Sequence, residues 1–433
     1  MPTRSQYELM SLKDKNMLMF VCFSSAIMFF DFLIYLYMAD IVSATFLPDI
    51  VDPKFAQLQG LGLFAIGYLA RPLGGILFGR YGDIKGRKPV LLYSMLATML
   101  SVLAMACLPT YAQWGWVATM LFIMLRMIQG MAFGVYVPLA WIFIAEHVPR
   151  QYLSLGCSYV TASFYVGVLF SNAFFIWLTS SMTPDQLMSN GWRLPFLIAA
   201  ILSCLPLLTW RLVKESPFFT DLTSRKPDKH TPKTFTLLFK HCRQSIFIGL
   251  MLTLIISSIT TVIILLLPDL MALRFSVDND LFNFAHSLGI IFMILGCIFY
   301  GLVSNYQNFG RILIIGSLLL IIQIFAFYYH LQAGGDYILI MYALLGFFAG
   351  IIGMIPAIFV LLFPTNVRLT GVAFSYNVMY GLVGGLVPFG LAYATLYISF
   401  SPALYIAFIG FIGVIMGLYF YHLPEFKKID TVI

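Results

Sequence analysis

Residues 71–88 read RPLGGILFGRYGDIKGRK, a stretch in which glycines and charges separate two long apolar runs. The first run covers residues 56–79, and the second covers residues 89–109. A helix needs about 20 apolar residues to cross a bilayer core that is about 30 Å thick. Because lipid offers no hydrogen bonds to an open backbone, each run should form a helix. The stretch therefore predicts a short charged turn between two transmembrane helices.

The same pattern repeats along the whole chain. Of the 433 residues, 61% are hydrophobic and 10% are charged, whereas about 25% are charged in an ordinary soluble domain. The first run carries Asp31 and lacks a small-residue cleavage site, so we expect a retained helix and no signal peptide. We predict an all-α membrane protein with twelve transmembrane helices. The predicted spans are 17–39, 56–79, 89–109, 116–145, 152–179, 195–213, 245–268, 281–303, 312–330, 337–363, 371–397 and 402–422.

The basic residues indicate how the helices are oriented. If the amino terminus is cytoplasmic, the 25 Lys and Arg residues divide into 20 inside, two within the membrane and three outside. This obeys the positive-inside rule, so we expect a bacterial inner-membrane protein with both termini in the cytoplasm. The net charge of +7 then reflects topology and contact with anionic lipid, and no nucleic-acid partner is implied. The lipid bilayer is therefore an expected partner, and we expect a monomer.

The longest polar segment, residues 214–244, lies between the sixth and seventh spans. We predict that it is a cytoplasmic linker between an amino-terminal bundle, residues 1–213, and a carboxy-terminal bundle, residues 245–433. Residues 82–88 after the second span are weakly echoed by residues 304–311 after the eighth, as expected for related halves. Transporters built in this way hold their substrate near the midplane, between the two bundles.

The sequence shows no pattern typical of an enzyme or a metal site. The six cysteines form no CxxC pair, so we expect reduced thiols and no metal. No nucleophile with a base, phosphate loop or nucleotide-binding motif can be assigned, so we expect no catalytic residue, no cofactor and no direct use of ATP. A channel or receptor is disfavoured because neither a pore-lining ring nor a soluble sensor domain is visible.

Several stretches resemble one family of transporters. Residues 71–88 resemble the loop between the second and third helices of the major facilitator superfamily. Over nearly the whole chain, the sequence further resembles the metabolite:proton symporter family, which includes permeases for proline and betaine, alpha-ketoglutarate, citrate and shikimate. The residues that carry this narrower resemblance are Asp31, Tyr35, Arg126, Gln129, Gly130 and residues 191–196, 215–218, 368–371 and 375–388.

This resemblance implies the major facilitator fold, with two pseudo-symmetric six-helix bundles. It also implies proton-coupled import of a small carboxylate or zwitterion by alternating access. The sequence departs from the family in the fourth span, where Tyr136 follows Gly134 and Val135 in place of Gly-Gly-Glu. The loop after the eighth span likewise has Asn305 in place of an acid. Two alternatives therefore stay open: a proton-driven exporter of drugs, and a transporter of a citrate-type siderophore or polycarboxylate.

Asp31 and Arg126 are the predicted proton-coupling residues. Asp31 lies mid-helix in an uncharged run, where a charge costs roughly several kcal/mol unless it is paired or solvated. An acid in such a place can load and release a proton. Arg126 is the one cation of the fourth span and the expected partner of Asp31, with Gln129 on the same helical face. The alternatives are a static ion pair for Asp31 and a structural tether for Arg126.

Other polar side chains within the spans are candidates for the substrate cavity. Arg71 is equally a candidate for a gate or for simple helix packing. The alternative for the tyrosines of the eleventh span is that they form an aromatic packing stripe. His286 is a candidate second protonatable group, or an interfacial residue hydrogen-bonded near Asn283. The cavity candidates are Tyr35, Arg71, Gln129, Tyr136, Tyr165, Asn172, Tyr376, Asn377 and Tyr380.

The charged turn predicts a gate at the cytoplasmic side. It combines one acid with several bases, which can clamp helix ends through charged hydrogen bonds and so hold an outward-open state. The alternative is that these charges only set topology. The predicted gate residues are Asp83, Gly86, Arg87 and Lys88, with Glu146 and Arg150 as their partners.

Overall fold

The computed structural model describes residues 9–48, 53–224, 234–268, 279–334 and 337–423, and these residues contain helices and no strand. The predicted all-α fold is therefore confirmed. The helices of the first half are α1 Leu12–Tyr37, α2 Ala39–Phe46, α3 Pro53–Lys85, α4 Arg87–Cys107, α5 Tyr111–Trp114, α6 Trp116–His147, η1 Arg150–Tyr152, α7 Leu153–Ser181, α8 Pro184–Gln186, η2 Leu187–Gly191, α9 Arg193–Leu208 and η3 Trp210–Leu212.

The second half of the chain is also built from long helices joined by short ones. Its long helices include a π-helical segment, η4, that continues α12, and a 3-10 segment, η5, that joins α16 to α17. The helices are α10 Pro217–Ser224, α11 Thr234–His241, α12 Arg243–Ile259, η4 Thr260–Leu266, α14 Asn279–Tyr306, α15 Phe309–Gln332, α16 Ile338–Ala349, η5 Gly350–Met354, α17 Ile355–Leu362, α18 Arg368–Tyr397 and α19 Ser401–His422.

Each predicted span has a helix in its place. Within the described residues, ten helices are long and apolar enough to cross a membrane, and the bent pair Pro184–Gly191 and Arg193–Leu208 gives an eleventh. The helix α3 has 33 residues, which is ample length to cross a membrane. The predicted linker, residues 214–244, contains the short helices α10 and α11, and its residues 225–233 lie outside the described part of the chain.

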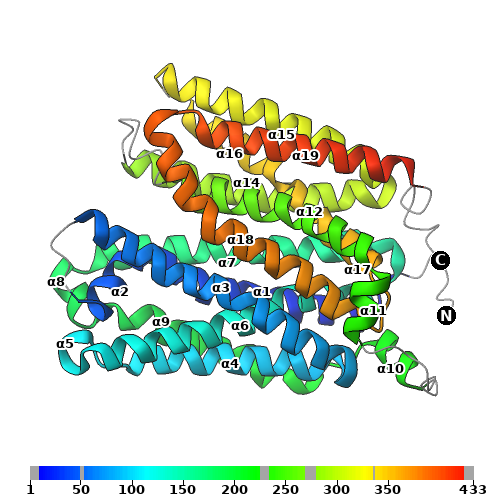
Figure 1. The fold of residues 1–433 in the computed structure, drawn as a ribbon, viewed down its shortest axis with the longest axis horizontal. Coiled ribbons are helices and arrows are strands. Elements are labelled where there is room, and N and C mark those ends of the chain that lie inside the picture. The colour runs from blue at the N-terminus through cyan, green and yellow to red at the C-terminus, as the bar shows by residue number, and fades with distance from the viewer. Residues whose placement is uncertain (1–8, 49–52, 225–233, 269–278, 335–336, 424–433) are drawn as a thin grey trace.

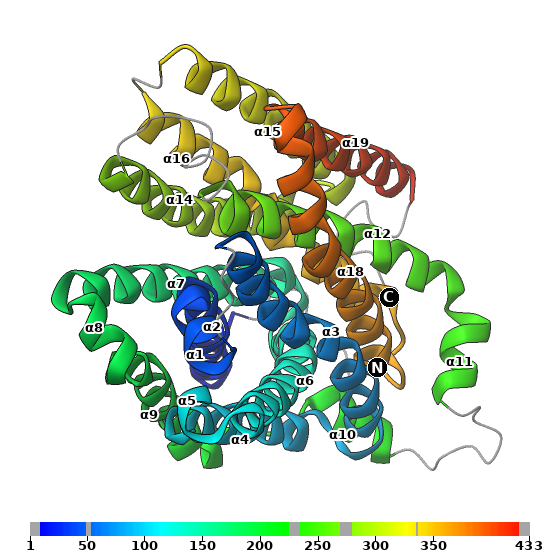
Figure 2. The same ribbon diagram turned by 60° about the vertical axis from the view of Figure 1, so that its left-hand side comes forward.

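The long helices form two groups that lie side by side (Figures 1 and 2). In the first group, α3 packs on α6, α1 on α7, and α4 on both α6 and α9. In the second group, α15 packs on α19, α14 on α16, and α12 on α18. The groups meet mainly where α3 lies on α18 and where α7 lies on α14. Large apolar side chains such as Leu100, Ile201 and Phe411 are exposed on the outside, as expected for a surface that faces lipid.

The two groups are joined most closely at one end of the molecule. We call this end, where α1 begins and α19 ends, the terminal face. There α3 and α18 are so close that a Cβ on Gly79 would lie 3.2 Å from Thr370 Cα. In both views the two helices diverge toward the opposite face (Figures 1 and 2). At that face a Cβ on Gly62 or on Gly390 would meet nothing within 4 Å. The structure is therefore closed at the terminal face.

Candidate functional site

Asp31 of α1 is buried in the first bundle, with 1% of its surface exposed. Gln129 of α6 donates from Nε2 to Asp31 Oδ1 at 3.0 Å. Arg126 donates from Nη1 to Gln129 Oε1 at 2.6 Å. The sequence predicted Arg126 as the partner of Asp31, and the structure instead places the Gln129 amide between them. An amide can do this because it offers a donor to the acid and an acceptor to the guanidinium.

Arg126 is fixed by aromatic contacts on the other helices of this bundle. Its guanidinium carbon lies 3.9 Å from the ring centroid of Tyr35 and 5.3 Å from that of Phe32. It also reaches α3, where a Cβ on Gly67 would lie 3.1 Å from its Nη2. Aromatic faces attract a guanidinium, so these contacts hold Arg126 inside the first bundle. Predicted residues Asp31, Tyr35, Arg126 and Gln129 therefore form one cluster.

Arg71 of α3 lies between the two bundles and is 1% exposed. Four rings surround its guanidinium, and we call them the aromatic cage. The distances from the guanidinium carbon to the ring centroids are 5.1 Å for Tyr68, 5.0 Å for Phe133, 5.2 Å for Tyr376 and 4.4 Å for Tyr380. Tyr68 and Phe133 come from the first bundle, and Tyr376 and Tyr380 come from α18 of the second.

Asn377 connects Arg71 to both bundles. Its Oδ1 accepts from Arg71 Nε at 3.2 Å, and its Nδ2 donates to the carbonyl oxygen of Gly134 at 2.6 Å. Gly75 leaves room for this side chain, since a Cβ there would lie 2.6 Å from Asn377 Nδ2. Arg71 Nη2 has no hydrogen-bond partner among the described residues. The cage thus holds a charged group with unused donor capacity.

The two clusters are neighbours. Phe32, which contacts Arg126, stacks on Phe133, which contacts Arg71, with ring centroids 4.1 Å apart. Tyr165 of α7 and Thr260 of η4 share a hydrogen bond of 2.7 Å across the two bundles. Three predicted cavity residues on α18, Tyr376, Asn377 and Tyr380, together with Arg71, therefore meet at the bundle interface.

The remaining predicted polar residues lie elsewhere. Tyr136 shares hydrogen bonds with Ser24 at 2.8 Å and Ser25 at 3.2 Å, so it joins α6 to α1. Asn172 donates to Ser287 Oγ at 2.9 Å, across α7 and α14.

His286 is not an interfacial residue near Asn283. It is buried, and its Nδ1 is 3.1 Å from the Tyr342 hydroxyl, which donates to the carbonyl oxygen of Ile263 at 2.9 Å. The carbonyl of Ile263 belongs to the π-helical segment η4. His286 therefore lies in a buried polar chain that joins α14, α16 and η4.

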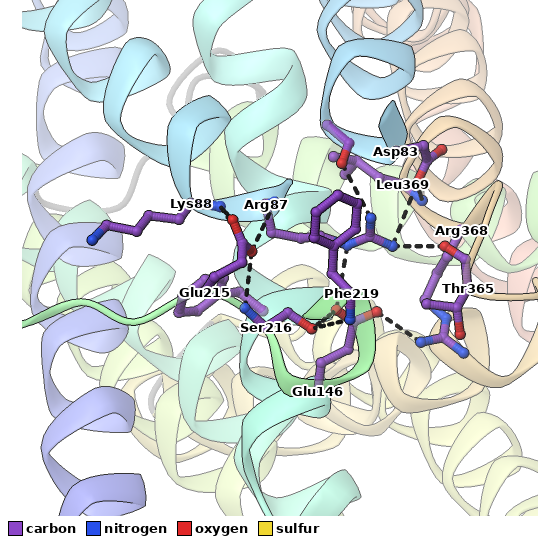
Figure 3. Close-up of polar contacts among 12 residues, drawn as sticks. Asp83, Arg87, Lys88, Glu146, Glu215, Ser216, Phe219, Thr365, Arg368 and Leu369 are labelled. Atoms are coloured by element: carbon purple, nitrogen blue, oxygen red, sulfur yellow. Dashed lines mark hydrogen bonds and ion pairs between the residues drawn. The ribbon is translucent and has the colours of Figure 1, made fainter. Parts of the chain in front are cut away.

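A charged latch closes the terminal face (Figure 3). Arg87 lies 3.5 Å from Asp83 and 3.3 Å from Glu146, and all three side chains are almost fully buried. Arg87 also donates to the carbonyl oxygen of Thr365 in the second bundle at 2.7 Å. Arg368, from the start of α18, lies 2.7 Å from Glu146. The network links residues that are more than 200 positions apart in the chain.

Asp83 adds a second link between the bundles. It accepts hydrogen bonds from the backbone nitrogens of Leu369 and Thr370, at 3.1 and 2.9 Å, and from the Thr370 hydroxyl at 2.7 Å. Two backbone donors at the first turn of α18 suit a carboxylate, because a helix amino terminus favours negative charge. Burial raises the pKa of Asp83 to about 6, although Arg87 and these donors act in the opposite direction.

Glu215 and Ser216, which follow the sixth span, complete the latch. Glu215 accepts from the backbone nitrogens of Arg87 and Lys88, at 2.9 and 3.1 Å, and so caps α4. Gly86 has φ of 112°, and a side chain there would collide with Glu215. The Ser216 hydroxyl donates to Glu146. Lys88 itself extends away, with its Nζ 4.9 Å from the Trp210 ring centroid.

Of the predicted gate residues, Asp83, Gly86, Arg87, Lys88 and Glu146 all lie in this latch. Arg150 has an exposed side chain at the start of η1. Arg368, which was not predicted as a gate residue, pairs with Glu146.

A family model described as Major Facilitator Superfamily matches residues 16–388 of this chain. The chain belongs to the Major Facilitator Superfamily. The inner membrane metabolite transport protein YhjE of Escherichia coli is 32% identical over 375 residues, which is 84% of each chain. The shikimate transporter of the same organism is 27% identical over 376 residues, 83% of each chain.

The fold agrees with this membership. The proton:xylose symporter XylE, bound to 6-bromo-6-deoxy-D-glucose, superposes with a TM-score of 0.81 at 18% identity, over 96% of this chain and 97% of XylE. The chain is therefore a multi-pass membrane transporter of the major facilitator fold and not an enzyme.

Several site residues of this major facilitator protein were not predicted. Tyr68 precedes Arg71 by three residues, so a search for aromatic side chains one turn from each buried charge would have found it. Glu215, Ser216 and Arg368 lie in stretches that carried the family resemblance, but no local signal gave them a role. Phe133 and Thr260 have no such signal, because an aromatic or hydroxyl side chain within an apolar helix is common.

Proposed function

We propose that this protein is a proton-coupled symporter that imports a small metabolite by alternating access. The observation that carries the proposal is Asp31, a buried acid held by Gln129 and Arg126, whose Oδ2 has no hydrogen-bond partner among the described residues. The names of the relatives are consistent with it, because YhjE is a metabolite transport protein and XylE is a proton:xylose symporter. The proposal needs no cofactor beyond the proton gradient.

The Asp31 cluster can exist in two charge states. The groups that face Asp31 are Gln129 and Arg126 of α6, with Tyr35 on its own helix and Tyr68 on α3 beside Arg126. When Asp31 is ionised, it balances the charge of Arg126 through the bridging amide. When Asp31 is protonated, the Gln129 hydrogen bond to Oδ1 can persist, and the proton has a place on Oδ2. The cluster can therefore carry a proton without being rebuilt.

The latch supplies the conformational half of the mechanism. By the positive-inside rule the terminal face is cytoplasmic, with both chain termini on that side of a bacterial inner membrane. The closed latch then corresponds to a state that loads from outside. Release to the cytoplasm requires Arg87, Glu146 and Arg368 to separate. Substrate and proton must favour that separation through contacts that differ between the two states.

The test is transport by proteoliposomes that contain the Asp31→Asn variant. We expect it to lose uptake driven by a pH gradient, while exchange of labelled for unlabelled substrate at equal pH continues. The matched control is Asp40→Asn, which makes the same chemical change at an exposed residue of α2. Proton-driven uptake that persists in Asp31→Asn at the level of the control would refute the role of Asp31. Vesicles of both orientations report whether transport is inward.

A further inference from the structure

The charges buried within the membrane-spanning parts of the helices do not balance. Among the carboxylates and guanidinium groups of the described residues, three are buried there: Asp31, Arg71 and Arg126. Asp31 is linked to Arg126 through Gln129. Arg71 is the second cation, and no carboxylate of the described residues is paired with it. Its guanidinium cannot lose its proton, so the positive charge must be met in another way.

The contacts of Arg71 do not supply a negative charge. An amide oxygen, the Tyr376 hydroxyl and four aromatic faces surround it. The attraction of a cation to an aromatic ring is weaker than the cost of removing an ion from water, even after the protein relaxes. Arg71 Nη2 also lacks a hydrogen-bond partner among the described residues. A carboxylate placed there would meet both the charge and the free donor.

We propose that the transported metabolite is an organic anion and that Arg71 binds its carboxylate within the aromatic cage. This rests on the proposed transport function and names its substrate class. A zwitterion such as a betaine carries its own cation and would leave the excess positive charge in place. The rings of the cage suit a compact apolar body, and the hydroxyl groups of Tyr376 and Tyr380 suit hydroxyl or keto substituents. The substrate is thus a small carboxylate, with Arg71 as its counterion, because Arg126 is already linked to Asp31 through a bridging amide.

This position couples the substrate to both the proton and the bundles. A bound carboxylate would compete with Asn377 Oδ1 for Arg71, and Asn377 is the residue that joins α18 to α3 and α6. The stacked rings of Phe32 and Phe133 separate Arg71 from Arg126. Charges interact strongly across such a low-dielectric layer. Protonation of Asp31 makes the region more positive, so proton and anion each strengthen the binding of the other.

The experiment measures binding to purified protein by thermal shift. The probes are shikimate, 2-oxoglutarate, lactate and citrate as anions, glycine betaine and proline as zwitterions, and xylose as a neutral compound. We expect saturable stabilisation by at least one of the anions, stronger at pH 5.5 than at pH 7.5. The carboxamide of that acid, which has the same shape without the charge, should bind about 10- to 100-fold more weakly, the loss expected for a charge-assisted contact.

The variants are Arg71→Gln and Arg71→Lys, with Arg80→Gln as the matched control at an exposed residue of the same helix. In Arg71→Gln the acid and its carboxamide should bind equally, and Arg71→Lys should retain part of the difference. Arg80→Gln should retain all of it. The comparison of acid with carboxamide on the unaltered protein remains decisive if Arg71→Gln fails to fold.

Three results would overturn this proposal. They are stabilisation by a zwitterion or xylose but by none of the anions, no stabilisation by any probe, and an acid preference that survives in Arg71→Gln. These outcomes are separate from the test of proton coupling. If an anion binds at Arg71 but the Asp31→Asn variant still shows proton-driven uptake, only the role of Asp31 is refuted. If the protein takes up a zwitterion by proton-driven transport, only the substrate class is refuted.

Discussion

The latch and the aromatic cage both join the two bundles and both bury arginine, but their charges are balanced differently. In the latch, Arg87 lies 3.5 Å from Asp83 and 3.3 Å from Glu146. In the cage, Arg71 contacts four rings and one amide, and no carboxylate of the described residues pairs with it. A paired buried charge favours the conformation that pairs it, whereas an unbalanced one favours a ligand that balances it. Under the proposed mechanism, the latch holds a state, and the cage receives a substrate.

The largest expected effect comes from Arg87→Gln, which leaves Asp83 and Glu146 buried without their shared cation. Breaking a buried ion pair from one side costs about 3–5 kcal/mol, so the closed state should lose its advantage. Spin labels at Lys214 and Tyr306, which are exposed at the terminal face on different bundles, should move apart. Arg80→Gln serves as the control. If the distance distribution is the same in both variants, the latch does not hold the closed state.

A smaller effect is expected from Glu215→Ala, which removes the cap from α4. Loss of a helix amino-terminal cap costs about 0.5–2 kcal/mol. The backbone nitrogens of Arg87 and Lys88, which follow Gly86, would lose the carboxylate that accepts their hydrogen bonds. The midpoint of thermal unfolding in detergent should fall. Asp185→Asn, at an exposed residue of α8, should leave it unchanged. An unaltered midpoint in Glu215→Ala would mean that water replaces the cap at no cost.

The third prediction concerns pH. In the closed latch the pKa of Asp83 is raised to about 6 by burial, and in an open latch it should return toward about 3.9. The closed state then binds the proton more tightly, so lowering the pH from 7 to 5 should increase the ratio of closed to open molecules by roughly tenfold. Spin-label distances between the bundles measure this population. Asp83→Asn should abolish the dependence, and a shift toward the open state in acid would contradict the sign.

The smallest effect is expected from Arg71→Met in the absence of substrate. Replacing a buried ion pair by apolar side chains is often neutral or stabilising because the desolvation cost is removed, and replacing Arg71 removes that cost without leaving a carboxylate of the described residues unpaired. The free energy of unfolding should therefore change by less than about 1 kcal/mol or rise, in contrast to Arg87→Gln. A fall of several kcal/mol would show that Arg71 is as much a structural residue as Arg87, and the difference between the two regions would disappear.

Much of the fold could be predicted because it depends on local patterns. Long apolar runs predict spans wherever they occur, and twelve predicted spans have a helix in their place. The charged turn at residues 71–88 was sufficient to suggest the superfamily, which the comparisons confirm. Asp83, Gly86, Arg87 and Lys88 could be predicted as gate residues because they lie within this one short stretch of sequence.

The partners of these residues could not be predicted in the same way. Gln129 was assigned to the cavity, but only the structure shows that it lies between Asp31 and Arg126. Arg150 was predicted as a partner of the charged turn, but only the structure shows that Arg368 pairs with Glu146. Both arginines are near the ends of helices, and nothing in their local sequence distinguishes them.

The sequence by itself therefore determined that the protein lies in lipid, where its long helices are, which family it belongs to and which few charges the membrane must accommodate. Hydrophobicity and motif spacing are properties of neighbouring residues, so they can be read along the chain. Only the tertiary structure decided which charges meet, because Arg87 and Arg368 are brought to Glu146 by the packing of helices from different bundles. The same packing surrounds Arg71 with rings from α3, α6 and α18, where we propose that a substrate balances its charge.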